Sequence, residues 1–236
     1  MSTINLEEAP GIILRRFDAQ RSDLILRILT RDSGKIVVVA RGARGSKKSL
    51  FAWIDIFDCG KFTYSSPKRP GDLAVLKGIS ERNVWANLRD DLTTFSIASL
   101  TLEVTDVFAR EGDPEAGDLF NPLFLCLQNL NQVNSDNKRF VCLIFYLIQL
   151  LRISGFDLLS DQCEEDSVET RWFGEMITRK VAFVPDSREL ITDGLLKLIR
   201  AIQGIDGYEL KTVEGVLQRL QNFASDQEEN RKIENT

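Results

Sequence analysis

The most informative absence in this sequence is histidine, which occurs nowhere in its 236 residues. Histidine is the commonest general base near neutral pH, the usual activator of serine and cysteine nucleophiles, and the commonest metal ligand. Its absence excludes Ser-His and Cys-His catalysis and any histidine-ligated metal site. Much enzyme chemistry is thereby excluded.

Cysteine is scarce and long apolar runs are missing. The four cysteines, Cys59, Cys126, Cys142 and Cys163, have wide, irregular spacings, which are typical of reduced thiols in a core. The longest apolar run, 140–148, is much shorter than the ~20 residues that span a bilayer. The start, MSTINLEEAP, has an acidic pair where a secretion signal would be positive. We therefore expect a cytoplasmic protein with no membrane partner.

Charge divides the chain into two parts of opposite sign. Residues 1–82 contain 15 Lys and Arg against 9 Asp and Glu, a net charge of +6. Residues 83–236 contain 15 against 26, a net charge of −11. The two parts are therefore expected to have different electrostatic partners.

The basic part has the pattern of a small β-barrel. Turn signals at 32–34 and 67–71 separate short β-rich segments. In one of them Leu24, Leu26 and Ile28 share a face, whereas Arg27 and Arg31 share the other. Five strands with a partly basic outer face match the OB-fold, a barrel that binds oligonucleotides, although an SH3-like barrel fits the strand count nearly as well. The expected strands are 11–17, 24–31, 34–41, 54–64 and 72–79.

Helical periodicity replaces the strand pattern from about residue 83. The predicted fold class is therefore α+β, with an N-terminal five-stranded OB-fold barrel followed by an α-helical domain. We expect the barrel at 1–82, the helical domain at 83–225 with a short β-like insertion near 180–186, and a disordered tail at 226–236. The expected helical segments are about 83–108, 119–130, 140–153, 189–203 and 212–223.

The glycine-punctuated stretch ARGARGSKKS, residues 40–49, is not a nucleotide-binding loop. A P-loop needs its second glycine directly before the lysine, but Lys47 occupies that place when counted from Gly42. Four cations near Phe51 and Trp53 instead suit single-stranded nucleic acid, because cations follow phosphates and bases stack on rings. Core positions for both rings and a merely solvated loop are the alternative. The candidate DNA-binding residues are Arg15, Arg27, Arg31, Lys35, Arg41, Arg44, Lys47 and Lys48.

These residues also carry a family resemblance. The stretch GIILRRFDAQRSDLILRILTRDSGKIVVVARGARGSKKSL resembles the N-terminal pattern of the RecO family of bacterial DNA repair and recombination mediators. A G-I-V-L-x-x-R-like strand, an E-S-D-like turn, a T-R-x-x-G-K turn and a K-G-A-R-like basic loop follow in that order. KRFVCLIFYLIQLLRISGF, AFVPDS and YELKTVEGVLQRL continue the likeness more weakly.

The resemblance implies a fold, a set of activities and several partners. The fold is an OB-fold, and the activities are binding of single- and double-stranded DNA and annealing of complementary strands. Together with RecR, the protein would also help the RecA recombinase to displace single-strand-binding protein. Many family members carry four cysteines as a zinc site, but only Cys163 stands in that region, before Glu164, Glu165 and Asp166. We expect no zinc, and the acidic run is more typical of a solvated segment than of a magnesium site. No cofactor is expected.

A second site is expected in the helical part. The acidic, apolar-ended tail of single-strand-binding protein needs cations beside an apolar groove. The candidate residues are Lys138, Arg139, Phe140 and, less directly, Arg152, although charges at a helix start also commonly face water.

Three classes of function remain to be distinguished. The first is a non-catalytic DNA-binding and annealing mediator, a monomer on its own, which we predict. The second is an adaptor whose helical domain binds partners without direct DNA binding. The third, a metal-dependent nuclease, lacks a compact motif of acids and lysine.

Overall fold

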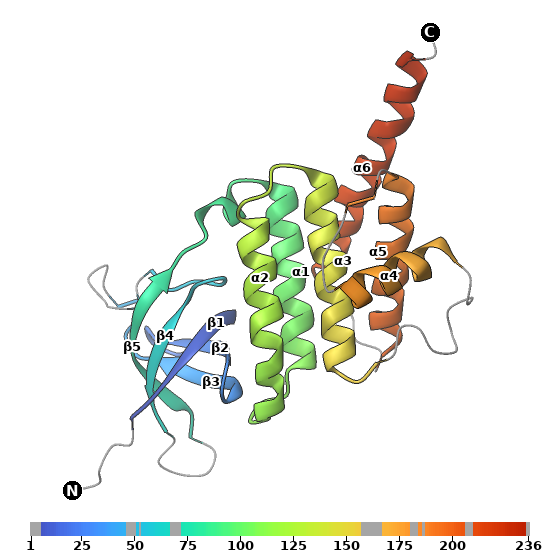
Figure 1. Cartoon of the computed structure of the whole chain (residues 1–236). Helices are drawn as coiled ribbons and strands as arrows, with labels where there is room; N and C mark the ends of the chain where they lie inside the picture. Colours follow the sequence, from blue (N-terminus) through green and yellow to red (C-terminus); the bar gives the residue numbers. More distant parts are fainter. Residues whose placement is uncertain are drawn as a thin grey trace, which may run out of the picture. The chain divides into compact units, whose positions relative to one another are not determined.

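The computed structural model describes most of the chain (Figure 1). The described residues are 6–45, 51, 53–66, 72–156, 167–179, 184–185, 187–205 and 210–234, with side chains as far as 224. They form two compact units that interleave along the sequence. The first unit is Met1–Trp85 with Leu102–Phe124, and the second is Ala86–Thr101 with Leu125–Thr236.

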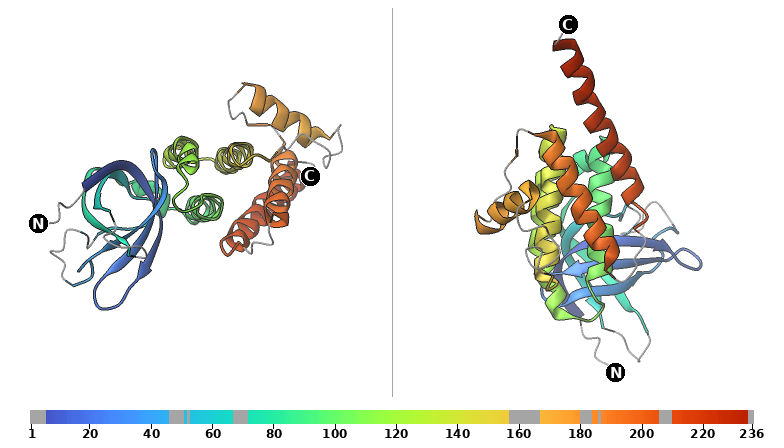
Figure 2. Two further views of the ribbon diagram at one scale, coloured as in Figure 1. Left: turned by 90° about the horizontal axis from the view of Figure 1, so that it is seen from below. Right: turned by 90° about the vertical axis from the view of Figure 1, so that its right-hand side faces the viewer.

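The first unit contains a closed five-stranded barrel with the order β1-β2-β3-β5-β4 (Figure 2, left). Neighbouring strands are antiparallel except β3 and β5, which are parallel. The long strand β1 closes the barrel because its first half pairs with β4 and its second half with β2, across an irregularity between Ile13 and Arg15. This is the OB-fold, so the predicted fold class is confirmed and the SH3-like alternative is wrong. The strands are β1 (Leu6–Asp18), β2 (Leu24–Thr30), β3 (Gly34–Ala40), β4 (Cys59–Ser65) and β5 (Ala74–Asn83).

The alternation read from the sequence sets the barrel core. Leu24, Leu26 and Ile28 are buried in one apolar cluster, together with inward residues of the other strands. Leu29, on the opposite face of β2, is also fully buried, and the short 3₁₀ helix η2 (Pro114–Leu119) packs against this strand. Part of the outer face of the barrel is therefore covered.

The segment before β4 differs from its predicted β-structure. The strand begins only at Cys59, because aspartates bind the local backbone amides of the preceding residues. The Asp58 carboxylate accepts the Asp55 N–H at 3.0 Å, and the Asp55 carboxylate accepts the Ile56 N–H at 2.9 Å. Phe57 is fully buried with a φ of 71°, outside the extended β region.

A close approach joins the β2–β3 turn to η2. Gly34 has a φ of +63°, and a Cβ there would lie 1.9 Å from the carbonyl oxygen of Asp113. A Cβ on Gly117 would likewise lie 2.3 Å from the carbonyl oxygen of Arg31. Glycine at both positions lets the turn and η2 touch through their backbones.

Helices follow the barrel from residue 86 onward. Asp91 caps the start of α1, since its carboxylate accepts the Thr94 N–H at 2.7 Å and the Thr94 hydroxyl at 2.9 Å. Ser187 caps α5 in the same way. The helices are η1 (Ala86–Arg89), α1 (Leu92–Phe108), α2 (Phe120–Leu130), α3 (Asp136–Ile153), α4 (Val168–Arg179), α5 (Arg188–Gly204) and α6 (Val213–Glu234).

Several helix boundaries differ from the sequence pattern. The expected segment 119–130 matches α2, and Pro122 is accommodated in its first turn, where a missing N–H costs little. Helix α4 was not predicted, and α6 continues to Glu234, into the segment expected to be disordered. The β-like segment near 180–186 lies largely outside the described residues.

Helix α3 forms the centre of the second unit. Most of its apolar run at 140–148 is buried, with Cys142 and Phe145 half-buried. Helix α5 packs against α3 and α6, and the ring of Phe140 lies 5.0 Å from that of Phe223. Among the described helices, none has the length and apolar content needed to cross a membrane.

Candidate nucleic-acid interface

Three of the predicted DNA-binding cations meet a single buried carboxylate. Asp106, on the second half of α1, is 3% exposed in its side chain. Its Oδ2 lies 2.8 Å from Arg15 Nε and 2.8 Å from Arg27 Nη1, and its Oδ1 lies 3.2 Å from Lys35 Nζ. Because these cations come from β1, β2 and β3, one aspartate fastens three neighbouring strands to α1.

Glu103 adds a second acid to this group, with Oε1 at 3.3 Å from Arg15 Nη2. Lys35 is the most enclosed of the cations, and its ammonium also donates to the Asp106 carbonyl oxygen at 2.5 Å. We call Arg15, Arg27, Lys35, Glu103 and Asp106 the Asp106 cluster. Its three cations already have carboxylate partners inside the barrel unit.

Arg31 lies outside this cluster. It follows β2 in the turn before β3 and is exposed. Its guanidinium stacks on the ring of Phe120 at 4.9 Å from the centroid. This cation–π contact leaves the charge without a carboxylate partner among the described residues, so it can still attract phosphate.

The basic loop after β3 is tied to the loop between β1 and β2. The guanidinium of Arg44 contacts the Asp18 carboxylate at 2.8 Å and donates to the carbonyl oxygens of Ala19 and Arg21. Arg41 is exposed and, within the part of the chain that the structure describes, has no ion-pair partner. Lys47 and Lys48 lie outside the described residues.

The two rings after this loop differ sharply in exposure. Phe51 is 8% exposed and belongs to the barrel core, whereas Trp53 is 70% exposed. Arg82, from the end of β5, donates to the Trp53 carbonyl oxygen at 2.6 Å. The sequence left open whether these rings are core or surface, and the answer is one of each.

The four predicted peptide-binding residues are not gathered at one point. Lys138 and Arg152 are exposed, but 14 positions along one helix separate them by about 21 Å. Phe140 is fully buried. The Arg139 guanidinium lies 2.6 Å from Asp136 and 3.6 Å from Asp91. Lys138 and Arg139 are therefore the pair that a single ligand can reach.

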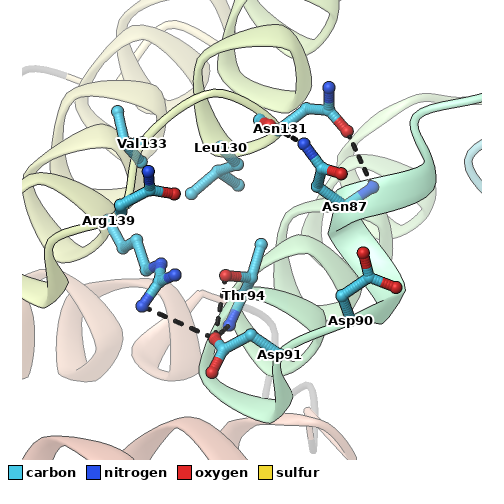
Figure 3. A pocket seen from close by; sticks show the side chains of 9 residues that line it. Asn87, Asp90, Asp91, Thr94, Leu130, Asn131, Val133 and Arg139 are labelled. Carbon is cyan, nitrogen blue, oxygen red and sulfur yellow. Dashed lines mark hydrogen bonds and ion pairs between the residues drawn. The ribbon is translucent and has the colours of Figure 1, made fainter.

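Arg139 lines a cavity of about 340 Å³ in the second unit (Figure 3). Side-chain and backbone hydrogen bonds between Asn87 and Asn131 border it on one side. Burial acts to raise the pKa of Asp91, but hydrogen bonds from Thr94 and the charge of Arg139 outweigh it and lower the pKa overall. The cavity is lined by Asn87, Asp90, Asp91, Thr94, Leu130, Asn131, Val133, Asn134 and Arg139.

No group of histidine, cysteine or acidic side chains able to hold a metal ion occurs among the described residues. Burial raises the pKa of Cys59 and of Cys142 to about 11, and it raises that of Cys126 as well. These three thiols are therefore protonated at neutral pH and weakly nucleophilic. Cys163 lies outside the described residues, so the zinc prediction stays a prediction.

The Asp106 cluster is the feature that sequence reasoning missed. Glu103 and Asp106 stand three residues apart on the apolar helix LEVTDVF. Carboxylates on a buried helix need cationic partners, which was a usable signal. The sequence could not show which cations pair with Asp106, because the three partners lie 71 to 91 positions before it.

The barrel order and its basic turns define an OB-fold protein with a helical continuation. The family model described as Recombination protein O N terminal matches residues 1–82, and the model described as Recombination protein O C terminal matches residues 89–233. The chain therefore belongs to the recombination protein O (RecO) family, which confirms the resemblance read from the sequence.

Individual relatives are distant and longer. The chain is 28% identical to the DNA repair protein RecO of Syntrophus aciditrophicus over 163 residues, which cover 69% of this chain and 61% of that protein. It is 28% identical to the DNA repair protein RecO of Listeria monocytogenes serotype 4b over 160 residues, covering 67% and 59%. The corresponding protein of Desulfatibacillum aliphaticivorans is 28% identical over 153 residues, covering 65% and 58%. The chain thus spans about three fifths of the length of the curated relatives it matches.

Proposed function

We propose that this protein is a non-catalytic, DNA-binding mediator of DNA repair and recombination. The observation that carries the proposal is the succession of the two RecO family matches along the chain, the first of them on an OB-fold barrel. OB-folds bind single strands through a cationic surface and their connecting loops, without covalent chemistry.

In this proposal the cations outside the Asp106 cluster follow the DNA backbone. Arg31 and Arg41 are exposed, and the same loop sequence supplies Lys47 and Lys48. Phosphates neutralised by these cations no longer repel a second strand, so complementary strands can approach and anneal. Base pairing, rather than the protein, then selects the sequence.

Protein partners complete the proposed role. Together with RecR, the protein would load RecA onto DNA that is coated with single-strand-binding protein. The acidic tail of that protein would dock at Lys138 and Arg139, where its carboxylate replaces Asp91, which is 3.6 Å from the guanidinium. Because the proposed partner is chromosomal DNA, we propose that the protein acts in the cytoplasm. We also propose that it is a monomer when no partner is present.

The adaptor alternative has one observation in its favour. Arg15, Arg27 and Lys35 are held by Asp106, so they supply less free positive charge to the barrel surface than the sequence indicates. An adaptor would bind partner proteins through its helical unit and would ignore oligonucleotides.

Fluorescence anisotropy of a labelled single-stranded oligonucleotide across a salt series tests the proposal. Binding should weaken linearly in a plot of log affinity against log salt. The triple variant with Ala at Arg41, Lys47 and Lys48 should bind all sequences more weakly, with a slope smaller by up to about 2, since each phosphate contact contributes about 0.7 on single strands. Arg44 is kept in this variant because it joins two loops.

Lys61→Ala is the matched control, because Lys61 is a barrel cation already paired with Glu8. It should change the slope less than any one of the three loop substitutions. A wild-type protein that binds no oligonucleotide at low salt would refute the mediator proposal and leave the adaptor.

A further inference from the structure

Trp53 is the most exposed large apolar side chain in the described structure, at 70%. The residues beside it in the loop behave differently, since Phe51 and Ile54 are buried in the barrel core at 8% and 3%. Phe51 and Ile54 therefore point inward, whereas the indole of Trp53 lies in solvent. A large ring in solvent offers a face on which a planar ligand can stack.

Several contacts hold the loop that carries this ring. The Asp58 carboxylate is 1% exposed and lies 2.6 Å from Arg82 Nη2, which also donates to the Trp53 carbonyl oxygen at 2.6 Å. Backbone hydrogen bonds join Ile13 to Asp58 at 2.9 Å and Phe57 to Ile13 at 3.2 Å. The exposure of Trp53 is therefore a feature of a fixed loop and not of a free chain end.

The surroundings of the ring favour a nucleobase over an apolar protein surface. Arg82 contacts the backbone of Trp53 itself, and Arg16 pairs with Asp55 two residues further on, at 3.6 Å. An aromatic ring exposed on a loop held by such ion pairs and polar contacts suits stacking on an unpaired base. A protein-docking loop would be expected to present a continuous apolar surface, whereas Phe51 and Ile54 point away.

We propose that Trp53 is a base-stacking residue for unpaired nucleotides of single-stranded DNA. This inference rests on the proposed DNA-binding function and adds a contact to the bases. Because the faces of bases inside a duplex are already stacked on one another, the contact favours single strands over double strands.

Tryptophan fluorescence gives a direct test on the full chain. Of the three tryptophans, Trp85 and Trp172 are only 3% and 4% exposed, so acrylamide should quench mainly Trp53. Titration with oligo(dT) of about 15 nucleotides, near the upper site size of an OB-fold, should quench the emission and reduce acrylamide access. An abasic oligonucleotide of equal length keeps the phosphates and should do neither.

Anisotropy with the two oligonucleotides separates the two proposals. Trp53→Ala should bind oligo(dT) roughly 5- to 150-fold more weakly, the loss typical of one stacked base, with unchanged affinity for the abasic strand. Trp53→Phe should retain most of the affinity. Leu6→Ala, which removes another exposed apolar side chain of the barrel, should change neither. All three variants should unfold within about 2 °C of the wild type, as expected for surface substitutions.

The outcomes that overturn the inference are distinct. If Trp53→Ala binds oligo(dT) as tightly as the wild type, the stacking role is wrong and the phosphate-based DNA binding stands. If the wild type binds neither oligonucleotide at low salt, both proposals fail, and the exposed ring is then assigned to a protein contact.

Discussion

Replacing Asp106 by Asn should destabilise the barrel unit more than any other single loss of negative charge in it. The substitution keeps the size of the side chain but removes the charge that three cations share at 2.8, 2.8 and 3.2 Å. It also directs an amide N–H₂ group at donors that need an acceptor. Glu103, which pairs with Arg15, would remain as a counterion.

The magnitude follows from the exposure of each partner. Breaking a buried ion pair by removing one member costs about 3–5 kcal/mol. The side chains of Arg15 and Arg27 are 31% and 40% exposed, so water can hydrate them and their share is small. Lys35 is 10% exposed, keeps the Asp106 carbonyl oxygen and loses its ion pair. We therefore expect the lower limit, about 3 kcal/mol, or a melting temperature lower by about 6–12 °C for a chain of this size.

Thermal unfolding followed by circular dichroism measures this effect. Asp118→Asn is the matched control, because Asp118 is an exposed acid in η2 of the same unit and should shift the transition by no more than about 2 °C. Adding Lys35→Met to the Asp106→Asn variant should recover part of the loss, since no buried cation then lacks its partner. A loss below about 0.5 kcal/mol, or no recovery in the double variant, would refute the reasoning.

Two further predictions concern the turn glycine and the α1 cap. Gly34→Ala should cost more than Gly42→Ala, although both have positive φ, because only at Gly34 would the new Cβ meet the Asp113 carbonyl oxygen. The strain alone costs about 1–2 kcal/mol, so denaturant unfolding should show the excess for Gly34. Asp91 has a lowered pKa in the folded protein, so wild type should be more stable than Asp91→Asn above the ordinary pKa of 3.8. That advantage should vanish as pH falls through the folded pKa, and equal pH profiles of the two melting temperatures would contradict it.

The fold was predictable where a local pattern determines it. Alternation in β2 placed Leu24, Leu26 and Ile28 in the core, and turn residues separated the strands. The irregular conformation of the loop at 53–58 could not be predicted from the sequence. It depends on aspartates that accept hydrogen bonds from neighbouring backbone amides and on buried Phe57 at positive φ. Local hydrophobicity there imitates a strand, and hydrogen-bond geometry decides otherwise.

The sequence predicted which cations belong to the candidate site, but not which of them are paired with carboxylates. A cation such as Arg27, on the outer face of a strand, has the same local pattern whether it faces solvent or a carboxylate from a distant helix. Its contact with Asp106 spans 79 positions, and no periodicity records such a pairing. Trp53 and Phe51 were likewise equivalent in sequence, since only the packed loop shows which ring points inward.

The barrel unit combines two separate stretches of the sequence, and this affects how DNA binding by a fragment of the chain should be interpreted. Cutting the chain at residue 82, where the first family match ends, would remove Glu103 and Asp106 and keep Arg15, Arg27 and Lys35. Such a fragment would carry three uncompensated positive charges in one small area, and any polyanion could take the place of the missing helix. Strong DNA binding by such an isolated barrel would then result from the loss of Asp106 and would not give the affinity of the intact protein. A fragment extended through residue 124 keeps its own counterions.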